Sequence, residues 1–282
     1  MRSAIGAVTS NDVRRVLLAI VISVLAFAVF GAAYAVQDPR VVHYTVAIAG
    51  LKQPLRLVQI SDSHASWIDM PPARLARVVA RANALHPDMI VLTGDYIGGK
   101  LVEWPEIRLE KALYPLGRLA APLGVFAVQG NHDSPLWTPR VFARTHVRLL
   151  VGQWVDVGPL LLVGADDLLN LPGPVEGLAA AVADAPPGKP MIALSHEPEF
   201  FQWLPPRVQL LLAGHTHGGQ IWLPGWPSLD GYLAAHRRGL FTEHGQTMIV
   251  SSGLGTSVVP LRIGVQPEIV VITLVPKADP RP

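Results

Sequence analysis

Apolar residues in this chain form one long run near the N-terminus, followed by many short runs. The long run, Val16–Val36, holds 21 residues without a charged side chain. As a helix it would be about 31 Å long, which is enough to cross the hydrocarbon core of a bilayer. No polar face interrupts this run, which disfavours a helix buried in a protein core. The pattern therefore predicts a transmembrane helix.

Charges beside the long run predict its orientation. Arg14 and Arg15 stand immediately before it, so the positive-inside rule places the N-terminus in the cytoplasm and the rest of the chain outside the cytoplasmic membrane. Two features favour a cleaved export signal instead: Ala33-Tyr34-Ala35 has a small-x-small form, and Arg14–Leu18 loosely resembles a twin-arginine signal. The run is longer than the usual apolar core of a signal peptide, so we favour a retained anchor. In either case the remainder is exported.

Short apolar runs and helical periodicity alternate after residue 36. This alternation predicts one layered α/β domain over residues 37–282, preceded by the anchor segment 1–36. The predicted strands are Val41–Ile48, Leu55–Ser61, Asp88–Thr93, Leu123–Gln129, Leu160–Gly164, Pro190–Ser195, Val208–Ala213, Thr247–Ser252 and Glu268–Leu274. The predicted helices are Ala73–Leu85, with Arg74, Arg77 and Arg81 on its polar face, Glu106–Leu119 and Val175–Ala183.

Composition narrows the possible chemistry. The chain has no cysteine, which excludes disulfides and thiolate metal sites. Its net charge of +2 comes from the N-terminal segment, because residues 37–282 carry equal numbers of basic and acidic side chains. We therefore expect no nucleic-acid-binding surface.

Five of the predicted strands end in polar residues suited to binding a ligand. Open α/β sheets bind their ligands outside the carboxyl ends of the strands. The residues at these ends are Asp62 and His64, Asp95, Asn131 and His132, His196, and His215 and His217. On an extended backbone His215 and His217 would point to the same side. Five such ends in one chain indicate a functional site.

The side chains at these strand ends favour a metal centre. Seven of them (Asp62, His64, Asp95, Asn131, His196, His215 and His217) offer oxygen and nitrogen ligands without sulfur, which suits Mn²⁺, Fe or Zn²⁺. Seven ligands exceed the needs of one tetrahedral ion and suit two divalent ions that share a bridging carboxylate. Two ions about 3.5–4 Å apart hold a bridging hydroxide and clamp the oxygens of an in-line displacement at phosphorus. Glycines beside Asp95, Asn131 and His215 would permit sharp turns and close approach of a substrate.

The ordered motifs DSH, GD, GNHD, a lone His after a strand, and GHTH resemble those of the calcineurin-like metallophosphoesterase family. The resemblance covers about Leu55–Leu274 and implies a four-layer α-β-β-α sandwich with a dinuclear centre. It implies that Asp62, His64 and His217 hold one metal, that Asn131, His196 and His215 hold the other, and that Asp95 bridges them. It also implies that His132 faces the substrate, as a general acid or as a stabiliser of phosphoryl charge.

Departures from the family's branches narrow the expected substrate. Protein serine/threonine phosphatases of this family carry GDYVDRG and GNHE, whereas this chain has Gly94–Lys100 (GDYIGGK) and Gly130–Asp133 (GNHD). The anchor, the Gly214–Gln220 segment (GHTHGGQ) and the late Gly253–Ser257 segment resemble a bacterial membrane-tethered, phosphodiesterase-type branch instead.

The resulting hypothesis is a membrane-anchored phosphodiesterase-type hydrolase that acts on an extracytoplasmic phosphoester, such as a cell-envelope lipid. The alternatives are a pyrophosphatase on a lipid-linked nucleotide sugar such as UDP-2,3-diacylglucosamine, and a non-catalytic scaffold. All seven expected ligands and His132 are present, which argues against the scaffold. We interpret Trp222, Trp226, Arg237, Arg238 and Arg262 as packing or surface residues.

Overall fold

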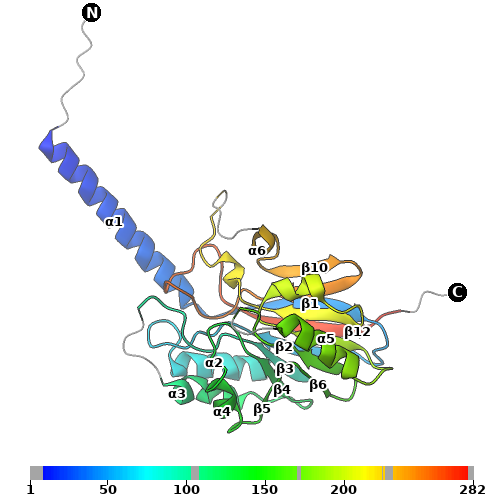
Figure 1. Cartoon of the computed structure of the whole chain (residues 1–282). Coiled ribbons are helices and arrows are strands. Elements are labelled where there is room, and N and C mark those ends of the chain that lie inside the picture. The colour runs from blue at the N-terminus through cyan, green and yellow to red at the C-terminus, as the bar shows by residue number, and fades with distance from the viewer. Residues whose placement is uncertain (1–8, 103–107, 170–172, 224, 226–230, 279–282) are drawn as a thin grey trace, which may run out of the picture.

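The protein is described by a computed structural model that places residues 9–102, 108–169, 173–223, 225 and 231–278. Two six-stranded sheets form its centre. Figure 1 shows helices covering the outer face of each sheet and one long helix, α1 (Ser10–Ala35), projecting from the sandwich.

The first sheet has the strand order β1-β12-β2-β3-β4-β5. Strands β2, β3, β4 and β5 run parallel, whereas β12 runs antiparallel to β2 and parallel to β1. Its strands are β1 (Arg40–Ile48), β2 (Leu55–Ile60), β3 (Met89–Thr93), β4 (Val125–Val128), β5 (Val147–Leu149) and β12 (Glu268–Pro276). The carboxyl ends of β2, β3 and β4 therefore lie side by side at one edge of this sheet.

The second sheet has the strand order β10-β11-β9-β8-β7-β6, in which β11, β9, β8 and β7 are parallel and the two outer strands are antiparallel. Its strands are β6 (Gln153–Asp156), β7 (Leu161–Gly164), β8 (Met191–Leu194), β9 (Val208–Ala213), β10 (Gly239–Glu243) and β11 (Gln246–Val250). The parallel neighbours β8 and β9 bring their carboxyl ends together.

Alternating side chains build a four-layer sandwich, as predicted. In β3, Met89 and Val91 face the other sheet, whereas Ile90 and Leu92 pack against helices. One helical layer contains α2 (Pro72–Asn83), α3 (Leu109–Leu113), the 3₁₀ turn η1 (Tyr114–Arg118) and α4 (Thr138–Phe142). The other contains α5 (Pro174–Asp184), the 3₁₀ turn η2 (Pro198–Trp203) and α6 (Gly231–Ala235).

Every predicted strand is present within one or two residues of its expected ends, but two helical predictions need correction. The helix expected over Glu106–Leu119 is a short α3 followed by η1, because Pro115 lacks the amide hydrogen that a continuous helix needs; residues 106 and 107 lie outside the described part. On α2, Arg74 is buried rather than solvated. Its guanidinium donates to the carbonyl of Ala35, the last residue of α1 (3.1 Å), and to that of Gln37, two residues later (2.8 Å).

Helix α1 begins six residues before the predicted apolar run, at Ser10, and ends at Ala35, one residue before the run does. Thr9 and Asp12 form a capping box at its first turn. Within the described residues it is the single helix long and apolar enough to span a membrane. Gly31 and Ala35 near its end are buried against the domain.

Candidate metal centre

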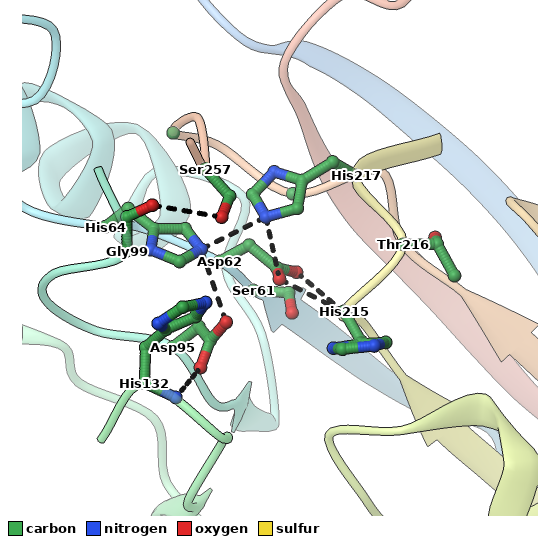
Figure 2. Close-up of polar contacts among 12 residues, drawn as sticks. Ser61, Asp62, His64, Asp95, Gly99, His132, His215, Thr216, His217 and Ser257 are labelled. Atoms are coloured by element: carbon green, nitrogen blue, oxygen red, sulfur yellow. Dashed lines mark hydrogen bonds and ion pairs between the residues drawn. The ribbon is translucent and has the colours of Figure 1, made fainter. Parts of the chain in front are cut away.

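The carboxyl ends of five strands converge at the same end of the two sheets. Asp62 and His64 follow β2, Asp95 follows β3, Asn131 and His132 follow β4, His196 follows β8, and His215 and His217 follow β9. Three of these strands belong to the first sheet and two to the second. The candidate site therefore lies across the junction between the sheets, as Figure 2 shows for most of its side chains.

One half of the site contains Asp62, His64 and His217. The ligand atoms of these residues and of Asp95 lie within 4.8 Å of one another, and all four residues are buried. The Nε2 atoms of His64 and His217 are 3.0 Å apart, and His217 Nε2 is 3.5 Å from Asp62 Oδ1. This half could hold a metal ion.

The other half contains Asn131, His196 and His215. His215 Nδ1 lies 3.1 Å from Asn131 Oδ1 and 3.2 Å from His196 Nε2. Burial and the neighbouring His196 lower the pKa of His215 to about 4. Its imidazole is therefore neutral, which is the form that binds a metal.

Asp95 stands between the two halves. Its Oδ2 atom lies 3.3 Å from His64 Nε2 and 3.1 Å from His196 Nε2. Its other oxygen, Oδ1, accepts a hydrogen bond from the backbone amide of His132 (2.9 Å). Although burial acts to raise the pKa of Asp95, the imidazoles of His196 and His64 hold it well below the usual value. One carboxylate oxygen thus faces a nitrogen ligand from each half.

The backbone of the site is strained. Asp62, His64, Asp95, His215 and His217 all have positive φ values, between 39° and 71°. Residues other than glycine seldom adopt this left-handed conformation, which costs about 1–3 kcal/mol each and concentrates at functional sites. The left-handed conformation also contradicts the prediction that His215 and His217 point to the same side. The segment from His215 to His217 is not extended, so His215 faces His196 whereas His217 faces His64.

Hydrogen bonds orient the rings of His64 and His196 toward the site. His64 Nδ1 and His196 Nδ1 each lie 2.7 Å from a backbone carbonyl, those of Gly98 and Thr93. A carbonyl only accepts, so each Nδ1 carries a proton and each Nε2 faces the site. Although burial acts to lower them, the Asp95 carboxylate raises the pKa values of both imidazoles, so a metal bound there would replace the Nε2 protons. The donor set contains no sulfur and suits Mn²⁺, Fe or Zn²⁺.

Glycines at two positions make room for the proposed ligands. A Cβ atom at Gly130 would collide with Asp95 Oδ1, and one at Gly214 would collide with the Ser61 hydroxyl and lie 2.5 Å from Asp62 Oδ2. These two positions need glycine because carboxylates pass directly beside the backbone.

A buried carboxylate, Asp133, joins the loops after β3 and β4. It accepts hydrogen bonds from the amides of Gly130 (2.9 Å), Asp95 (2.8 Å) and Tyr96 (2.9 Å). Burial and the neighbouring Asp95 carboxylate raise its pKa to about 7. Asp133 fixes the backbone of Asp95 and Asn131 relative to each other.

A buried lysine joins the loop after β3 to the loop after β2 and to the loop that carries Thr256. The Nζ atom of Lys100 donates to the carbonyls of His64 (3.0 Å) and Thr256 (3.1 Å) and pairs with Asp69 Oδ1 (3.1 Å). Asp69 in turn accepts from the Thr256 hydroxyl (2.6 Å). The Gly94–Lys100 segment thus fixes both the backbone carbonyl and the ring of His64.

The remaining residues of interest have structural roles or lie outside the description. Arg262 is fully buried and donates to the carbonyls of Ser252 and Gly255, and its Nη2 atom lies 3.3 Å from His217 Nδ1, so it fixes a loop and the ring of His217. Arg237 stacks on the Trp222 ring, with its guanidinium carbon 4.5 Å from the centroid. Trp226 lies outside the described residues. The interpretation of Trp222, Arg237 and Arg262 as packing residues agrees with these contacts.

Glu197 is the site residue that the sequence analysis missed. Its carboxylate lies with His196 and His215 in a group whose ligand atoms are within 4.8 Å of one another. Glu197 Oε1 is buried and has no hydrogen-bond partner among the described residues, and burial raises the pKa of this carboxyl to about 8. Adjacency to His196 is the only signal in the sequence. The unpartnered oxygen fits a cation bound in this half.

We expect Glu197→Gln to weaken metal binding in the half formed by His196 and His215. Loss of a neighbouring carboxylate typically reduces metal affinity by about 10- to 100-fold. Titration calorimetry with Mn²⁺ and Zn²⁺ measures the affinity of each half. The exposed Glu176→Gln on α5 is the matched control. Unchanged affinity in Glu197→Gln would limit this side chain to packing.

The profile of the calcineurin-like phosphoesterase family matches residues 55–219. The matched segment contains every residue of the candidate centre. The chain belongs to this family. The family is one of metal-dependent enzymes, and membership agrees with the Asp/His cluster that could hold metal.

Curated relatives are similar over most of the chain. A transmembrane protein with metallophosphoesterase domain from Danio rerio is 30% identical over 97% of this chain and 65% of its own length. The metallophosphoesterase YkuE of Bacillus subtilis is 31% identical over 78% of each chain. The UDP-2,3-diacylglucosamine pyrophosphatase LpxG of Chlamydia trachomatis is 29% identical over 71% of this chain and 78% of its own. Together with the family match, these relatives support a hydrolase of phosphoester bonds and, with α1, an association with membranes.

Proposed function

We propose that this protein is a membrane-anchored phosphodiesterase-type hydrolase with a dinuclear metal centre. The observation that carries the proposal is Asp95 Oδ2, which lies within 3.3 Å of a histidine nitrogen from each half of the site. A single carboxylate oxygen in that position suits a bridge between two ions. A metal-binding role would also account for the strained backbone at five of the seven ligands, since such strain is typical of functional sites.

In this proposal Asp62, His64 and His217 hold one divalent ion, Asn131, His196 and His215 hold the second, and Asp95 binds both. Bound divalent ions of this kind polarise phosphoryl oxygens and lower the pKa of water. The carbonyls of Gly98 and Thr93 orient two of these ligands, because they accept hydrogen bonds from Nδ1 of His64 and of His196. Asp133 and Lys100 fix the loops that carry them.

His132 is proposed as the proton donor to the leaving oxygen. Its backbone amide, and not its ring, is bonded to Asp95. The ring lies edge-on to His64, with the two centroids 5.3 Å apart, and is exposed beside the cluster (Figure 2). It is thus close to the site and open to a substrate, and partial burial lowers the pKa of its imidazole, which makes the protonated ring a stronger acid toward a leaving oxygen.

The proposed location is outside the cytoplasmic membrane. Arg14 and Arg15 precede the apolar part of α1, which favours a cytoplasmic N-terminus and a domain on the other side. A cell-envelope phosphoester, including a lipid, is the corresponding substrate. The name of the Chlamydia relative favours a second candidate, a pyrophosphatase acting on a lipid-linked nucleotide sugar. That substrate would require a domain on the cytoplasmic side.

A substrate panel tests the proposed reaction. The full chain in detergent, loaded with Mn²⁺, Fe²⁺ or Zn²⁺, is assayed with aryl and alkyl phosphodiesters, the matching monoesters, and UDP-linked pyrophosphates. We expect the highest kcat/KM with diesters. A preference for the pyrophosphates would establish the second candidate, and inactivity toward all three classes with two ions bound would overturn the proposal.

Topology is tested separately. We expect a reporter fused after Pro282 to show an extracytoplasmic C-terminus and the protein to sediment with membranes. Protease protection in spheroplasts shows on which side of the membrane the domain lies, independently of the reporter. A variant with additional basic residues directly after α1 is the control, because it should reverse the orientation of the helix. A mature N-terminus at Val36 would show cleavage after Ala35 and would rule out the anchor.

A further inference from the structure

The end of α1 is fixed directly to loops of the candidate centre. The carbonyl of Gly31 accepts a hydrogen bond from the amide of Arg262 (3.1 Å), and a Cβ atom at Gly31 would lie 3.3 Å from Leu261 Cβ. The Arg262 guanidinium reaches the carbonyl of Gly255, whose amide bonds to the carbonyl of the metal-site residue Asp62. The end of α1 therefore lies beside the loops that carry the site.

Exposed apolar side chains gather on the loops at this edge. Leu101 and Val102 are 76% and 70% exposed, and Val258 is also exposed. The amide of Leu101 donates to the carbonyl of Val258 (2.9 Å), so these side chains come from paired segments. Trp67 and Ile68, on the loop between His64 and α2, are exposed as well. We call these five residues, Trp67, Ile68, Leu101, Val102 and Val258, the collar.

The collar lies beside three of the loops that build or support the centre. Ala65 pairs with Ile97, and Lys100 pairs with Val258, in isolated β-bridges. Lys100 in turn donates to the carbonyl of His64, and the Ser257 hydroxyl donates to Gly99 O beside His64 (Figure 2). The apolar side chains thus lie one or two residues from groups that position the metal ligands.

An apolar groove continues the collar toward α2 and α3. It has a volume of about 410 Å³ and is lined by Trp67, Pro71, Pro72, Ala73, Lys111 and Tyr114. Trp and Tyr are enriched at membrane interfaces, where the ring sits among headgroups, and Lys keeps its ammonium in water while its methylenes contact apolar surface. Tyr114 is exposed at this position.

We propose that the collar is a membrane-contact surface that seats the domain on the bilayer from which α1 emerges. The occupant is the lipid interface because α1, the adjacent anchor, is docked on the same face, and Figure 1 shows it leaving the domain beside these loops. Only residues 36–39 separate α1 from β1, which span at most about 14 Å. The domain has no long tether that would let this face turn away.

This surface has a consequence for the substrate. This consequence rests on the proposed function and refines it. The phosphoester that reaches the centre is part of a lipid, whose phosphate lies in the headgroup layer and whose chains lie in the bilayer beside the collar. Apolar exposed loops are unfavourable in water and favourable at an interface.

The absence of cysteine allows a direct test with the full chain. Ile68→Cys, Val102→Cys and Val258→Cys are each labelled with bimane and reconstituted in phosphatidylcholine–phosphatidylglycerol vesicles that contain a shallow doxyl lipid quencher. Val24→Cys in α1 is the positive control. Trp203→Cys is the matched control, because Trp203 is exposed before the start of β9, at the edge of the sheet opposite the site.

We expect quenching at the three collar positions comparable to that in α1, and little quenching at position 203. Quenching at the collar as weak as at position 203 would overturn the proposal. Collar labels that are shielded from water but unquenched by doxyl lipid would also overturn it, since they would indicate a second copy or another protein on this face.

Charge substitution in the collar connects the surface to the reaction. Val102→Glu and Val258→Glu are compared with the unmodified chain on soluble bis(p-nitrophenyl) phosphate and on a lipid-tailed p-nitrophenyl phosphodiester in vesicles. We expect hydrolysis of the lipid to fall on the order of tenfold, with hydrolysis of the soluble diester unchanged. Equal rates on the lipid for variants and unmodified chain would refute the collar. An unmodified chain inactive on both diesters would overturn the proposed function, while the quenching pattern still decides the collar.

Discussion

Asp95→Asn is expected to lower metal occupancy in both halves of the centre and nearly abolish hydrolysis. Asparagine keeps the size of the side chain, tolerates the positive φ of 55° at this position, and still has an oxygen to accept the His132 amide. It places an amide nitrogen, however, where Asp95 Oδ2 faces His64 and His196. An uncharged NH₂ group does not bridge two cations.

The expected loss of kcat/KM on bis(p-nitrophenyl) phosphate is about a thousandfold, larger than the roughly 10- to 100-fold cost of altering an outer-shell partner. Elemental analysis of the purified full chain measures the ions bound per molecule. Asp156→Asn is the matched control, because Asp156 is an exposed carboxylate paired with Lys189 far along the chain from the site. Two ions still bound to Asp95→Asn would contradict the bridging role.

The positions of the site loops could be predicted because strand ends follow from simple patterns. Apolar runs such as Val208–Ala213 are buried on both faces and end where glycine and polar residues begin. Parallel strands then bring their carboxyl ends to one edge. The order of β2, β3 and β4 in one sheet and β8 and β9 in the other was not readable from those runs, since strand pairing depends on contacts between distant segments.

The backbone conformation of the site loops could not be predicted from the periodicity of apolar residues. The prediction for His215 and His217 assumed an extended segment, whereas both residues are left-handed. Tertiary contacts impose this conformation: the amide of His215 donates to Asp62 Oδ1 (3.1 Å), a residue 153 positions away. A pattern of neighbouring residues contains no information about such a contact.

Buried polar partners were missed for a related reason. Glu197, Lys100 and Asp69 look like surface residues in a sequence, because charged side chains are mostly exposed. In the structure each is withdrawn from water beside the centre: Lys100 pairs with Asp69, and Glu197 lies against the histidines. The prediction of a solvated Arg74 was wrong for the same reason, because its partners are carbonyls at and just after the end of α1. These groups became predictable only once the loops were placed.

The second large effect is expected from His132→Ala, which should retain both metal ions and the fold while slowing the reaction. The ring of His132 is exposed, and its backbone amide makes the contact with Asp95, so alanine preserves that contact. General acid catalysis typically contributes about 10²–10⁴-fold, which sets the expected loss of kcat. His43→Ala, which removes an exposed histidine on β1, is the matched control.

The loss in His132→Ala should depend on the leaving group. A p-nitrophenyl ester has a leaving oxygen of low pKa that needs little protonation, so it should lose the least, whereas an alkyl diester should lose the most. A series of aryl and alkyl diesters therefore gives a steeper dependence of log kcat on leaving-group pKa in the variant than in the unmodified chain. A uniform loss across the series would assign His132 to charge stabilisation at the phosphoryl oxygens. Loss of a metal ion from the variant would make His132 a ligand, because a side chain that only donates a proton can be removed without changing the metal content.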